Sequence, residues 1–368
     1  MNKQLIIFNP SIEDGGVEKN LFLITNYLIE KGLDVSLITA NKEKKKFFNK
    51  RLNFISANNN YWSYKGRFLK TIFCFYLLLN FYFNNKNFLI LSFQANIYAI
   101  FFSTILNLKI ITRSNTAPGS WSSNIFKRLI FKILFKYPKE IIVNSFDFKK
   151  QLDREFNIKS VCIYNPFNKY DVEKKSKKKI SFNFFKNDDS FLNIINIGRM
   201  TDQKDQMLIL KSLNNLKDRI KFRCLILGKG VNYSNLRNFI IHNKLKKHIK
   251  LLGFQSNPYP YIKKSNLFVL SSRFEGLPNV LLEAQYLNKF IISTDCPTGP
   301  KEILLNGKLG NLIKVGNQKQ LEERVLYYYK NRNTSKLKNK IKMGKENMKR
   351  FDFNFNCYKY YKTIKKYI

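Results

Sequence analysis

The residues best suited to chemistry lie in the segment Ser271–Glu283, which reads SSRFEGLPNVLLE. An apolar, strand-like run leads into a short loop with Glu275 and Gly276, and Pro278 occupies the position where a helix commonly begins. The free N–H groups and the positive dipole of such a helix start attract anions, and Gly276 lets a ligand approach the backbone closely. Glu283, about one and a half turns into the helix, could accept hydrogen bonds from paired hydroxyls such as a ribose diol. The structural alternatives are a helix cap and a surface carboxylate.

The elements that position this segment alternate between strands and helices. The expected strands are LIIFN, DVSLITA, FLILSF and KIIT in the first half, and FLNIINIG, FRCLILG, IKLLGF, NLFVLSS and FIISTD in the second. They are continuous apolar runs, as expected when helices cover both faces of a parallel sheet. The sequence therefore predicts an α/β fold with two doubly wound, Rossmann-like domains, which face each other across a cleft at the carboxyl ends of their strands.

The chain length and one charged segment indicate where these domains end. The 368 residues are too many for one ordinary α/β unit and suit two. The stretch 168–190 is charged and lacks a sustained apolar stripe, so it interrupts the alternation. We expect an N-terminal domain over residues 1–170, a linker over 171–190 and a C-terminal domain over 191–345. A closing helix over 346–368 could pack back on the N-terminal domain.

The net charge restricts the partners. The chain has 66 Lys and Arg against 25 Asp and Glu, a formal charge of +41. Nucleic acid, an anionic bilayer and phosphorylated small molecules are the partners that such an excess suggests. The alternative is a compositional bias that over-uses Lys, Asn, Ile and Phe. A nucleic-acid-binding protein would show a reading module or a concentrated arginine face, whereas this charge is spread along the chain as lysine, so we expect no nucleic-acid partner.

The cysteines and the apolar segments favour a cytoplasmic protein that does not span a membrane. Five cysteines, none spaced as CxxC, argue against a disulfide framework or a zinc knuckle. The N-terminus MNKQLIIFNP reads as a strand rather than a signal peptide. The apolar run Phe68–Phe83 is shorter than the ~20 residues that a spanning helix needs, and Lys70 and Asn80 interrupt it. We expect a buried or interfacial helix there.

The paired glutamates belong to a larger resemblance. Glu275 and Glu283, separated by seven residues and framing GLP, resemble the paired-glutamate motif of glycosyltransferase family 4, which has the GT-B fold and retaining chemistry. INIGRMTDQKDQMLILKSL is similar to the start of that family's second domain, with Arg199 and Lys204 as its diphosphate-binding pair. LILGKG, LLGF and ISTDCPTGPKEIL follow in the family's order, and the GGVEKN loop at 15–20 adds to the match.

The resemblance implies a role for each matching residue. Arg199 and Lys204 would neutralise the leaving diphosphate, and such preorganised groups are worth ~10²–10³ in rate each. Glu275 would contact sugar hydroxyls, and it would be a catalytic residue together with Arg199 and Lys204. The remaining substrate-binding residues would be Gly15 and Gly16 at the first helix, Gly228 and Gly230 near the base, Gly276 and Leu277 beside the sugar, and Glu283 at the ribose. Arg113, in the segment ITRSNTAPG, could also face the cleft, although an ordinary loop is an equal alternative.

The resemblance also concerns cofactors and one missing group. Many relatives carry a histidine near the sugar in the first domain, but this chain has only His242 and His248. At the end of the strand FLILSF it has Ser92, Phe93 and Gln94 instead. Retaining chemistry in the family is usually explained without an enzymic base, because the leaving phosphate accepts the proton of the acceptor. GT-B enzymes generally use basic residues and helix dipoles instead of a divalent ion. We therefore predict no metal and no cofactor other than the sugar-nucleotide substrate.

A basic amphipathic helix is predicted at residues 123–140. It combines an apolar stripe with cations, namely Phe126, Ile130, Ile133 and Leu134 with Lys127, Arg128, Lys132 and Lys136. Such a helix can lie on an anionic bilayer, or it can pack its stripe on the sheet and leave its lysines in water. We expect the helix to lie on the membrane, because the family's acceptors are commonly lipid-pyrophosphate-linked glycans or lipopolysaccharide core.

Together these features predict a retaining transferase that moves a hexose or N-acetylhexosamine from a UDP-sugar to a lipid-linked or lipopolysaccharide acceptor. We expect it to be peripheral on the cytoplasmic face of the inner membrane, in surface-polysaccharide assembly. A GT-B-fold nucleotide-sugar epimerase or hydrolase is the main alternative, although such enzymes usually need several carboxylates and a histidine in the cleft. A dehydrogenase is disfavoured, because no GxGxxG follows the first strand.

Overall fold

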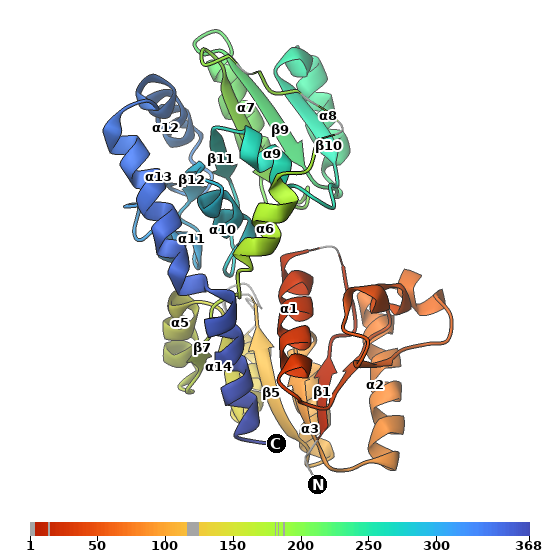
Figure 1. Cartoon of the computed structure of the whole chain (residues 1–368). Coiled ribbons are helices and arrows are strands. Elements are labelled where there is room, and N and C mark those ends of the chain that lie inside the picture. The colour runs from red at the N-terminus through yellow and green to blue at the C-terminus, as the bar shows by residue number, and fades with distance from the viewer. Residues whose placement is uncertain (1–3, 14, 116–124, 181, 183, 187) are drawn as a thin grey trace. The chain divides into compact units, whose positions relative to one another are not determined.

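A computed structural model describes the chain at residues 4–13, 15–115, 125–180, 182, 184–186 and 188–368, without the side chains of 125–127 (Figure 1). It divides into two compact units. The first comprises Met1–Pro166 together with Phe353–Ile368, and the second comprises Phe167–Asp352. The C-terminal helix α14 (Phe353–Lys365) therefore lies in the first unit, although the whole second unit precedes it in the sequence.

The first unit contains a seven-stranded sheet of order β3-β2-β1-β4-β5-β6-β7, in which every pairing is parallel. Its strands are β1 (Gln4–Phe8), β2 (Val35–Ile38), β3 (Asn53–Ile55), β4 (Phe88–Ser92), β5 (Lys109–Ser114), β6 (Glu140–Val143) and β7 (Val161–Cys162). Its helices besides α14 are α1 (Gly16–Glu30), α2 (Arg67–Asn84), α3 (Asn96–Ile105), α4 (Ile125–Leu134) and α5 (Phe146–Phe156).

Helices cover both faces of this sheet, which explains the continuous apolar strands. In β1, Leu5 and Ile7 face a core shared with α1 and α14. Ile6 and Phe8 point the other way, into a core shared with α2, α3 and α5. Successive side chains of a strand point to opposite faces, so a strand buried on both sides must be apolar throughout.

The second unit contains a six-stranded parallel sheet of order β10-β9-β8-β11-β12-β13. Its strands are β8 (Leu192–Ile197), β9 (Phe222–Leu227), β10 (Ile249–Gly253), β11 (Leu267–Leu270), β12 (Phe290–Thr294) and β13 (Asn311–Ile313). Its helices are α6 (Lys169–Ser176), α7 (Gln206–Leu216), α8 (Tyr233–His242), α9 (Tyr259–Lys264), α10 (Asn279–Tyr286), α11 (Pro300–Ile303), α12 (Gln318–Asn331) and α13 (Ser335–Asn347).

These two units confirm the predicted fold class of paired doubly wound α/β domains, while the cleft between them stays a prediction. The structure places the start of the predicted linker in the second unit as helix α6. Asn168 caps this helix, with its side chain accepting a hydrogen bond from the backbone N–H of Asp171 at 3.1 Å. The side-chain amide of Asn257 donates to the carbonyl of Lys175 at 3.0 Å and ties α6 to the segment before α9.

The apolar run Phe68–Phe83 forms most of α2. Cys74 and Leu78 are fully buried against the first sheet. Burial raises the pKa of the Cys74 thiol well above its ordinary value, so the thiol stays neutral. Among the helices formed by the described residues, none combines the length and the hydropathy needed to cross a bilayer.

Candidate active site

Two loops at the carboxyl end of the second sheet lie side by side. One follows β8 and leads into α7, and the other follows β11 and leads into α10. Ser271 Oγ donates to the carbonyl of Lys204 at 2.8 Å, and the backbone N–H of Arg273 donates to the carbonyl of Gln203, also at 2.8 Å. The strands β8 and β11 are neighbours in the sheet, so their carboxyl ends bring the two loops together.

The contact between the loops is centred on an ion pair. Nζ of Lys204 lies 2.5 Å from Oε1 of Glu275, and Oγ of Ser272 donates to the same oxygen at 2.6 Å. The side chains of Lys204 and Glu275 are 15% and 8% exposed, so the pair is largely withdrawn from water. A lysine that pairs with one carboxylate oxygen can exchange this partner for another anion, such as a diphosphate.

The backbone around Glu275 is held by the end of β12 and by the segment that follows it. Thr298 Oγ1 donates to the carbonyl of Glu275 at 2.5 Å, and Thr294 Oγ1 donates to the carbonyl of Ser272 at 2.6 Å. Gly299 has φ +87°, and a Cβ there would lie 1.8 Å from the carbonyl oxygen of Gly276. Only glycine can occupy position 299 without moving the loop that carries Glu275.

The predicted diphosphate-binding pair lies in the loop after β8. Arg199 is exposed, and its carbonyl accepts a hydrogen bond from Gln206 Nε2 at 3.0 Å. The Lys204 side chain passes over Gly198, where a Cβ would meet its Cγ at 3.4 Å. The structure therefore places Arg199 and Lys204 on one loop at the carboxyl edge of the sheet; their binding of diphosphate stays a prediction.

Gly228 and Gly230 follow β9 and lie against that loop. A Cβ on Gly228 would come within 1.9 Å of the carbonyl oxygen of Gly198, and one on Gly230 within 2.3 Å of that of Met200. The backbone N–H of Met200 donates to the carbonyl of Lys229 at 2.9 Å. Both glycines thus allow the close backbone approach that positions the β8 loop. Their predicted contact with a base stays a prediction.

Glu283 is in the second turn of α10 and is only 3% exposed. A surface carboxylate is therefore excluded. Burial raises the pKa of Tyr259, on the neighbouring helix α9, and the negative charge of Glu283 raises it further. Gly276 and Leu277, which lead into α10, are also buried. The assignment of Glu283 to a ribose and of Gly276 and Leu277 to a sugar stays a prediction.

In the first unit, Gly15 caps α1 with an extended backbone and Gly16 is its first residue. The first turn of this helix already carries a carboxylate of the chain. Oε1 of Glu18 accepts a hydrogen bond from the backbone N–H of Glu13 at 3.3 Å, and a Cβ on Gly15 would lie 2.8 Å from Oε2. A negative charge at this position interacts favourably with the helix dipole. The role of Gly15 and Gly16 in substrate binding stays a prediction.

The structure corrects the prediction that Arg113 binds substrate. Arg113 is 0% exposed, on β5. Its Nε donates to Tyr360 Oη at 2.8 Å, its Nη2 to Asn165 Oδ1 at 2.7 Å and its Nη1 to Asn115 Oδ1. The guanidinium therefore fastens α14 to the carboxyl end of the first sheet, and each of its three nitrogens donates to a side chain of the protein.

The two histidines take no part in the site loops. His242 ends α8, with Nδ1 2.8 Å from the carbonyl oxygen of Asn238, and His248 packs against Phe222. After β4, where the resemblance led us to expect a histidine, Gln94 Oε1 accepts a hydrogen bond from the backbone N–H of Ser11 at 3.1 Å. Within the described ranges, no group of three or more His, Cys, Asp or Glu is arranged to hold a metal ion.

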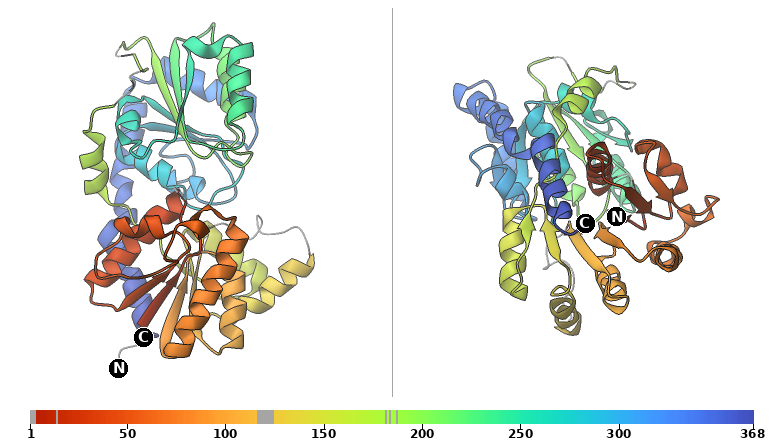
Figure 2. Two further views of the ribbon diagram at one scale, coloured as in Figure 1. Left: turned by 90° about the vertical axis from the view of Figure 1, so that its right-hand side faces the viewer. Right: turned by 60° about the horizontal axis from the view of Figure 1, so that its bottom comes forward.

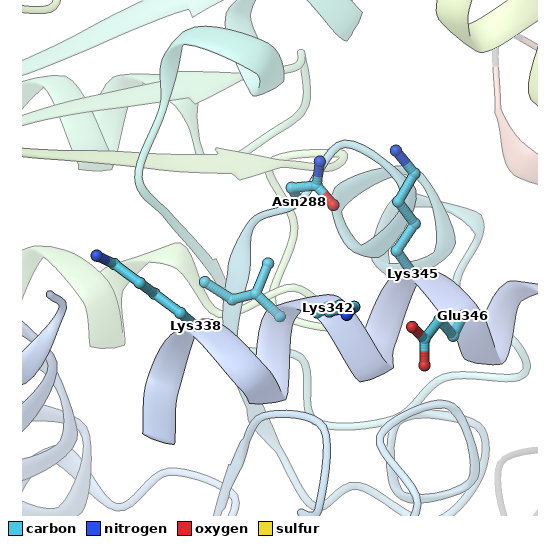
Figure 3. Close-up of a pocket in the computed structure, with 6 residues that line it drawn as sticks. Asn288, Lys338, Lys342, Lys345 and Glu346 are labelled. Carbon is cyan, nitrogen blue, oxygen red and sulfur yellow. The ribbon is translucent and has the colours of Figure 1, made fainter. Parts of the chain in front are cut away.

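A surface pocket of about 550 Å³ lies along α13 and is separate from these loops (Figure 3). It is lined by Asn288, Lys338, Ile341, Lys342, Lys345 and Glu346. None of the residues predicted to bind the donor lines it, so it is not the candidate site.

Sequence reasoning missed the residues that hold Glu275 in place. Ser272, Thr294, Thr298 and Gly299 contact the Glu275 loop, and Cys296 is buried beside it. Burial, and secondarily the charge of Glu275, raise the pKa of Cys296 to about 12, so this thiol is neutral. The motif ISTDCPTGPKEIL indicated the segment, but its spacing does not show which side chains reach Glu275.

Two units, each built on a parallel α/β sheet, are the architecture of the GT-B class of glycosyltransferase fold. Among solved structures, an Anabaena HepE in complex with UDP and glucose has a TM-score of 0.78 at 14% identity, over 99% of this chain and 100% of that one. A glycosyltransferase from Rickettsia africae also gives 0.78, at 20% identity, over 100% and 99%. Residues 176–348 match the family described as glycosyl transferases group 1.

Curated relatives agree with this assignment. An uncharacterized glycosyltransferase of Methanocaldococcus jannaschii is 37% identical over 201 residues, 52% of this chain and 48% of the relative. The N-acetylgalactosamine-N,N'-diacetylbacillosaminyl-diphospho-undecaprenol 4-alpha-N-acetylgalactosaminyltransferase of Campylobacter jejuni is 28% identical over 258 residues, 65% of this chain and 68% of the relative. The aligned stretches thus span about half to two thirds of these relatives. The predicted resemblance to glycosyltransferase family 4 is confirmed.

Proposed function

We propose that this protein is a retaining glycosyltransferase that moves a hexose or N-acetylhexosamine from a UDP-sugar to a lipid-linked oligosaccharide or lipopolysaccharide acceptor. The observation that carries the proposal is the Lys204–Glu275 pair, 2.5 Å apart at the carboxyl edge of the second sheet. It joins a cation suited to a diphosphate with a carboxylate suited to sugar hydroxyls. The UDP complex of the Anabaena neighbour and the undecaprenol-linked acceptor named for the Campylobacter relative support the choice of substrates.

The chemistry follows from the charges around this pair. Breaking the glycosidic bond leaves negative charge on the diphosphate, which Arg199 and Lys204 would neutralise together with the N-terminal amides of α10. When the diphosphate replaces Glu275 as the partner of Lys204, Glu275 becomes available to accept hydrogen bonds from the sugar. The leaving phosphate would receive the proton of the acceptor hydroxyl. On this proposal the reaction needs no metal ion, because fixed cations and helix dipoles stabilise the leaving group.

A lipid-linked acceptor determines where such an enzyme works. UDP-sugars are cytoplasmic and the acceptor's lipid lies in a bilayer, so the site must operate at a membrane surface. We therefore propose a peripheral location on the cytoplasmic face of the inner membrane.

The proposal is tested by incubating the purified chain with radiolabelled UDP-sugars and a bacterial membrane extract, with and without a chelator. Incorporation of label into lipid that is unaffected by the chelator is expected. Release of free sugar without a lipid product would instead indicate a hydrolase, and metal-dependent incorporation would contradict the charge-based mechanism.

The ribose assignment has its own test in Glu283→Ala. Loss of charge-assisted hydrogen bonds worth ~1.5–3 kcal/mol should lower kcat/KM for the donor by about 10–100-fold. Glu323→Ala, which removes an exposed carboxylate on α12, is the matched control and should leave the kinetics unchanged. Donor kinetics of Glu283→Ala equal to those of the control would refute the assignment.

A further inference from the structure

Two helices of the first unit expose large apolar side chains to water. Five of these side chains are each at least 50% exposed, namely Phe68, Ile72 and Phe83 on α2 and Phe101 and Ile105 on α3. They recur at helical spacing, on the sides of α2 and α3 that face away from the buried residues Cys74, Leu78, Ala99 and Ile100. Each helix is therefore apolar on two sides, and only one of those sides packs on the sheet.

The exposed sides of these helices belong to one continuous surface. The rings of Phe75 on α2 and Phe102 on α3 stack with centroids 5.0 Å apart. Tyr137, which follows α4, donates through Oη to the carbonyl of Ser103 on α3 at 3.0 Å. Helix α4 extends the surface with Leu129, Ile130 and Ile133, which are 55%, 51% and 63% exposed. Figure 2 shows these helices along one face of the first sheet, and we call their outer side the α2–α4 face.

The charge of this region is one-sided. Residues 44–139 contain 16 Lys and Arg and no Asp or Glu, so all 25 acidic residues of the chain lie elsewhere. Exposed cations border the apolar side chains, among them Lys86, Lys132 and Lys136. A compositional bias would enrich lysine throughout the chain, but it would not remove every carboxylate from one continuous segment.

We propose that the α2–α4 face binds an anionic lipid bilayer, a proposal that rests on the transfer to a lipid-linked acceptor inferred above. Aromatic and aliphatic side chains on this face enter the boundary between headgroups and acyl chains, while the bordering lysines contact anionic headgroups. Docking against a second copy would bring two surfaces together that are rich in lysine and poor in carboxylates, and their repulsion opposes it. An anionic bilayer supplies both the apolar phase and the opposite charge.

The experiment is co-sedimentation of the full-length chain with vesicles of phosphatidylcholine alone or mixed with phosphatidylglycerol. We expect binding to the anionic vesicles that weakens but persists at high salt, because burial of apolar side chains is not screened. The variant Ile72→Gln/Phe83→Gln/Phe101→Gln should reduce the partition coefficient at least tenfold. Phe355→Gln/Tyr358→Gln, at positions 54% and 52% exposed on α14, is the matched control on the opposite face of the sheet and should bind like wild type.

Three outcomes overturn the proposal. The triple variant could bind vesicles as well as wild type, the wild type could fail to bind vesicles, or the wild type could be a dimer while the triple variant is a monomer. The last result would make the α2–α4 face a contact between copies. Thermal stabilisation by UDP, measured on the same samples, verifies that the triple variant is folded. It also separates the two proposals. If UDP does not stabilise the wild type, the proposed donor site is contradicted, whereas the result with vesicles still tests the α2–α4 face.

Discussion

Replacing Glu275 by glutamine asks whether the Lys204–Glu275 pair is poised for an anionic ligand or only stabilises the fold. The substitution keeps the shape of the side chain, and Ser272 can still donate to its amide oxygen. It removes the negative charge that lies 2.5 Å from Nζ of Lys204. The ammonium of Lys204, on a side chain that is only 15% exposed, would then lack its carboxylate partner.

The expected magnitude follows from the burial of the pair. At an effective dielectric of about 20, opposite unit charges about 3 Å apart attract by roughly 5 kcal/mol, and the desolvation of both ions cancels much of this. Removing one partner of a fully buried pair costs about 3–5 kcal/mol. Because Lys204 retains some access to water, we expect the free energy of unfolding to fall by about 2–3 kcal/mol. The sugar transfer rate should fall by about 100-fold or more.

UDP provides the decisive assay. Its diphosphate would replace the missing negative charge, so saturating UDP should restore most of the lost stability in urea unfolding. Calorimetry should show UDP binding to Glu275→Gln at least as tightly as to wild type, whereas Lys204→Met should bind it more weakly. Weaker UDP binding by Glu275→Gln, or undiminished binding by Lys204→Met, would refute the reasoning that this lysine serves the diphosphate.

Three further predictions follow from single residues. Gly299→Ala should destabilise the chain by roughly 2–4 kcal/mol in thermal unfolding and abolish transfer, while Gly316→Ala, at φ +72° with open space around it, isolates the cost of φ alone and should retain activity. Arg113→Met should lower stability by about 3 kcal/mol, because Tyr360 and its other partners lose a buried charged donor, and leave UDP affinity unchanged. Burial lowers the pKa of Lys289 from 10.5 to about 8. Below pH 8 the folded protein must bury the charged ammonium, which destabilises it. Above pH 10.5 the amine is neutral in both the folded and the unfolded state, so this destabilisation is gone. In urea titrations across that window, the stability of wild type relative to Lys289→Met should rise by about 3 kcal/mol. A difference that does not change with pH would contradict the lowered pKa.

The architecture could be predicted because its strands are buried on both faces. A strand such as β1, with side chains in two cores, must be apolar throughout, and that pattern is visible locally. Helix α6 was not predicted, because KYDVEKKS has no apolar stripe. Only Val172 and Ser176 are buried in this helix, which depends on the Asn168 cap and on the contact of Asn257 with Lys175.

The site was predictable to the extent that its residues lie in contiguous motifs. Glu275 and Lys204 lie in two such motifs, and the structure brings them within 2.5 Å. The support from Thr298 and Gly299 comes from a different strand end, and local spacing carries no information on such contacts. Arg113 shows the opposite error, since its position at a strand end suggested access to a ligand. Whether this guanidinium faces solvent or the protein depends on α14, whose Tyr360 comes 247 positions later in the chain.

The return of the chain to its first unit has a consequence for folding during synthesis. Residues 167–352 form one continuous unit and can fold as soon as they leave the ribosome. The first unit must wait for residues 353–368, because Cys357, Tyr360 and Ile364 complete its core against α1. Until then the nascent N-terminal sheet lacks the side chains that complete this core, and Arg113 lacks its hydrogen bond to Tyr360 but keeps its partners Asn115 and Asn165. A product truncated before residue 353 could not leave that state.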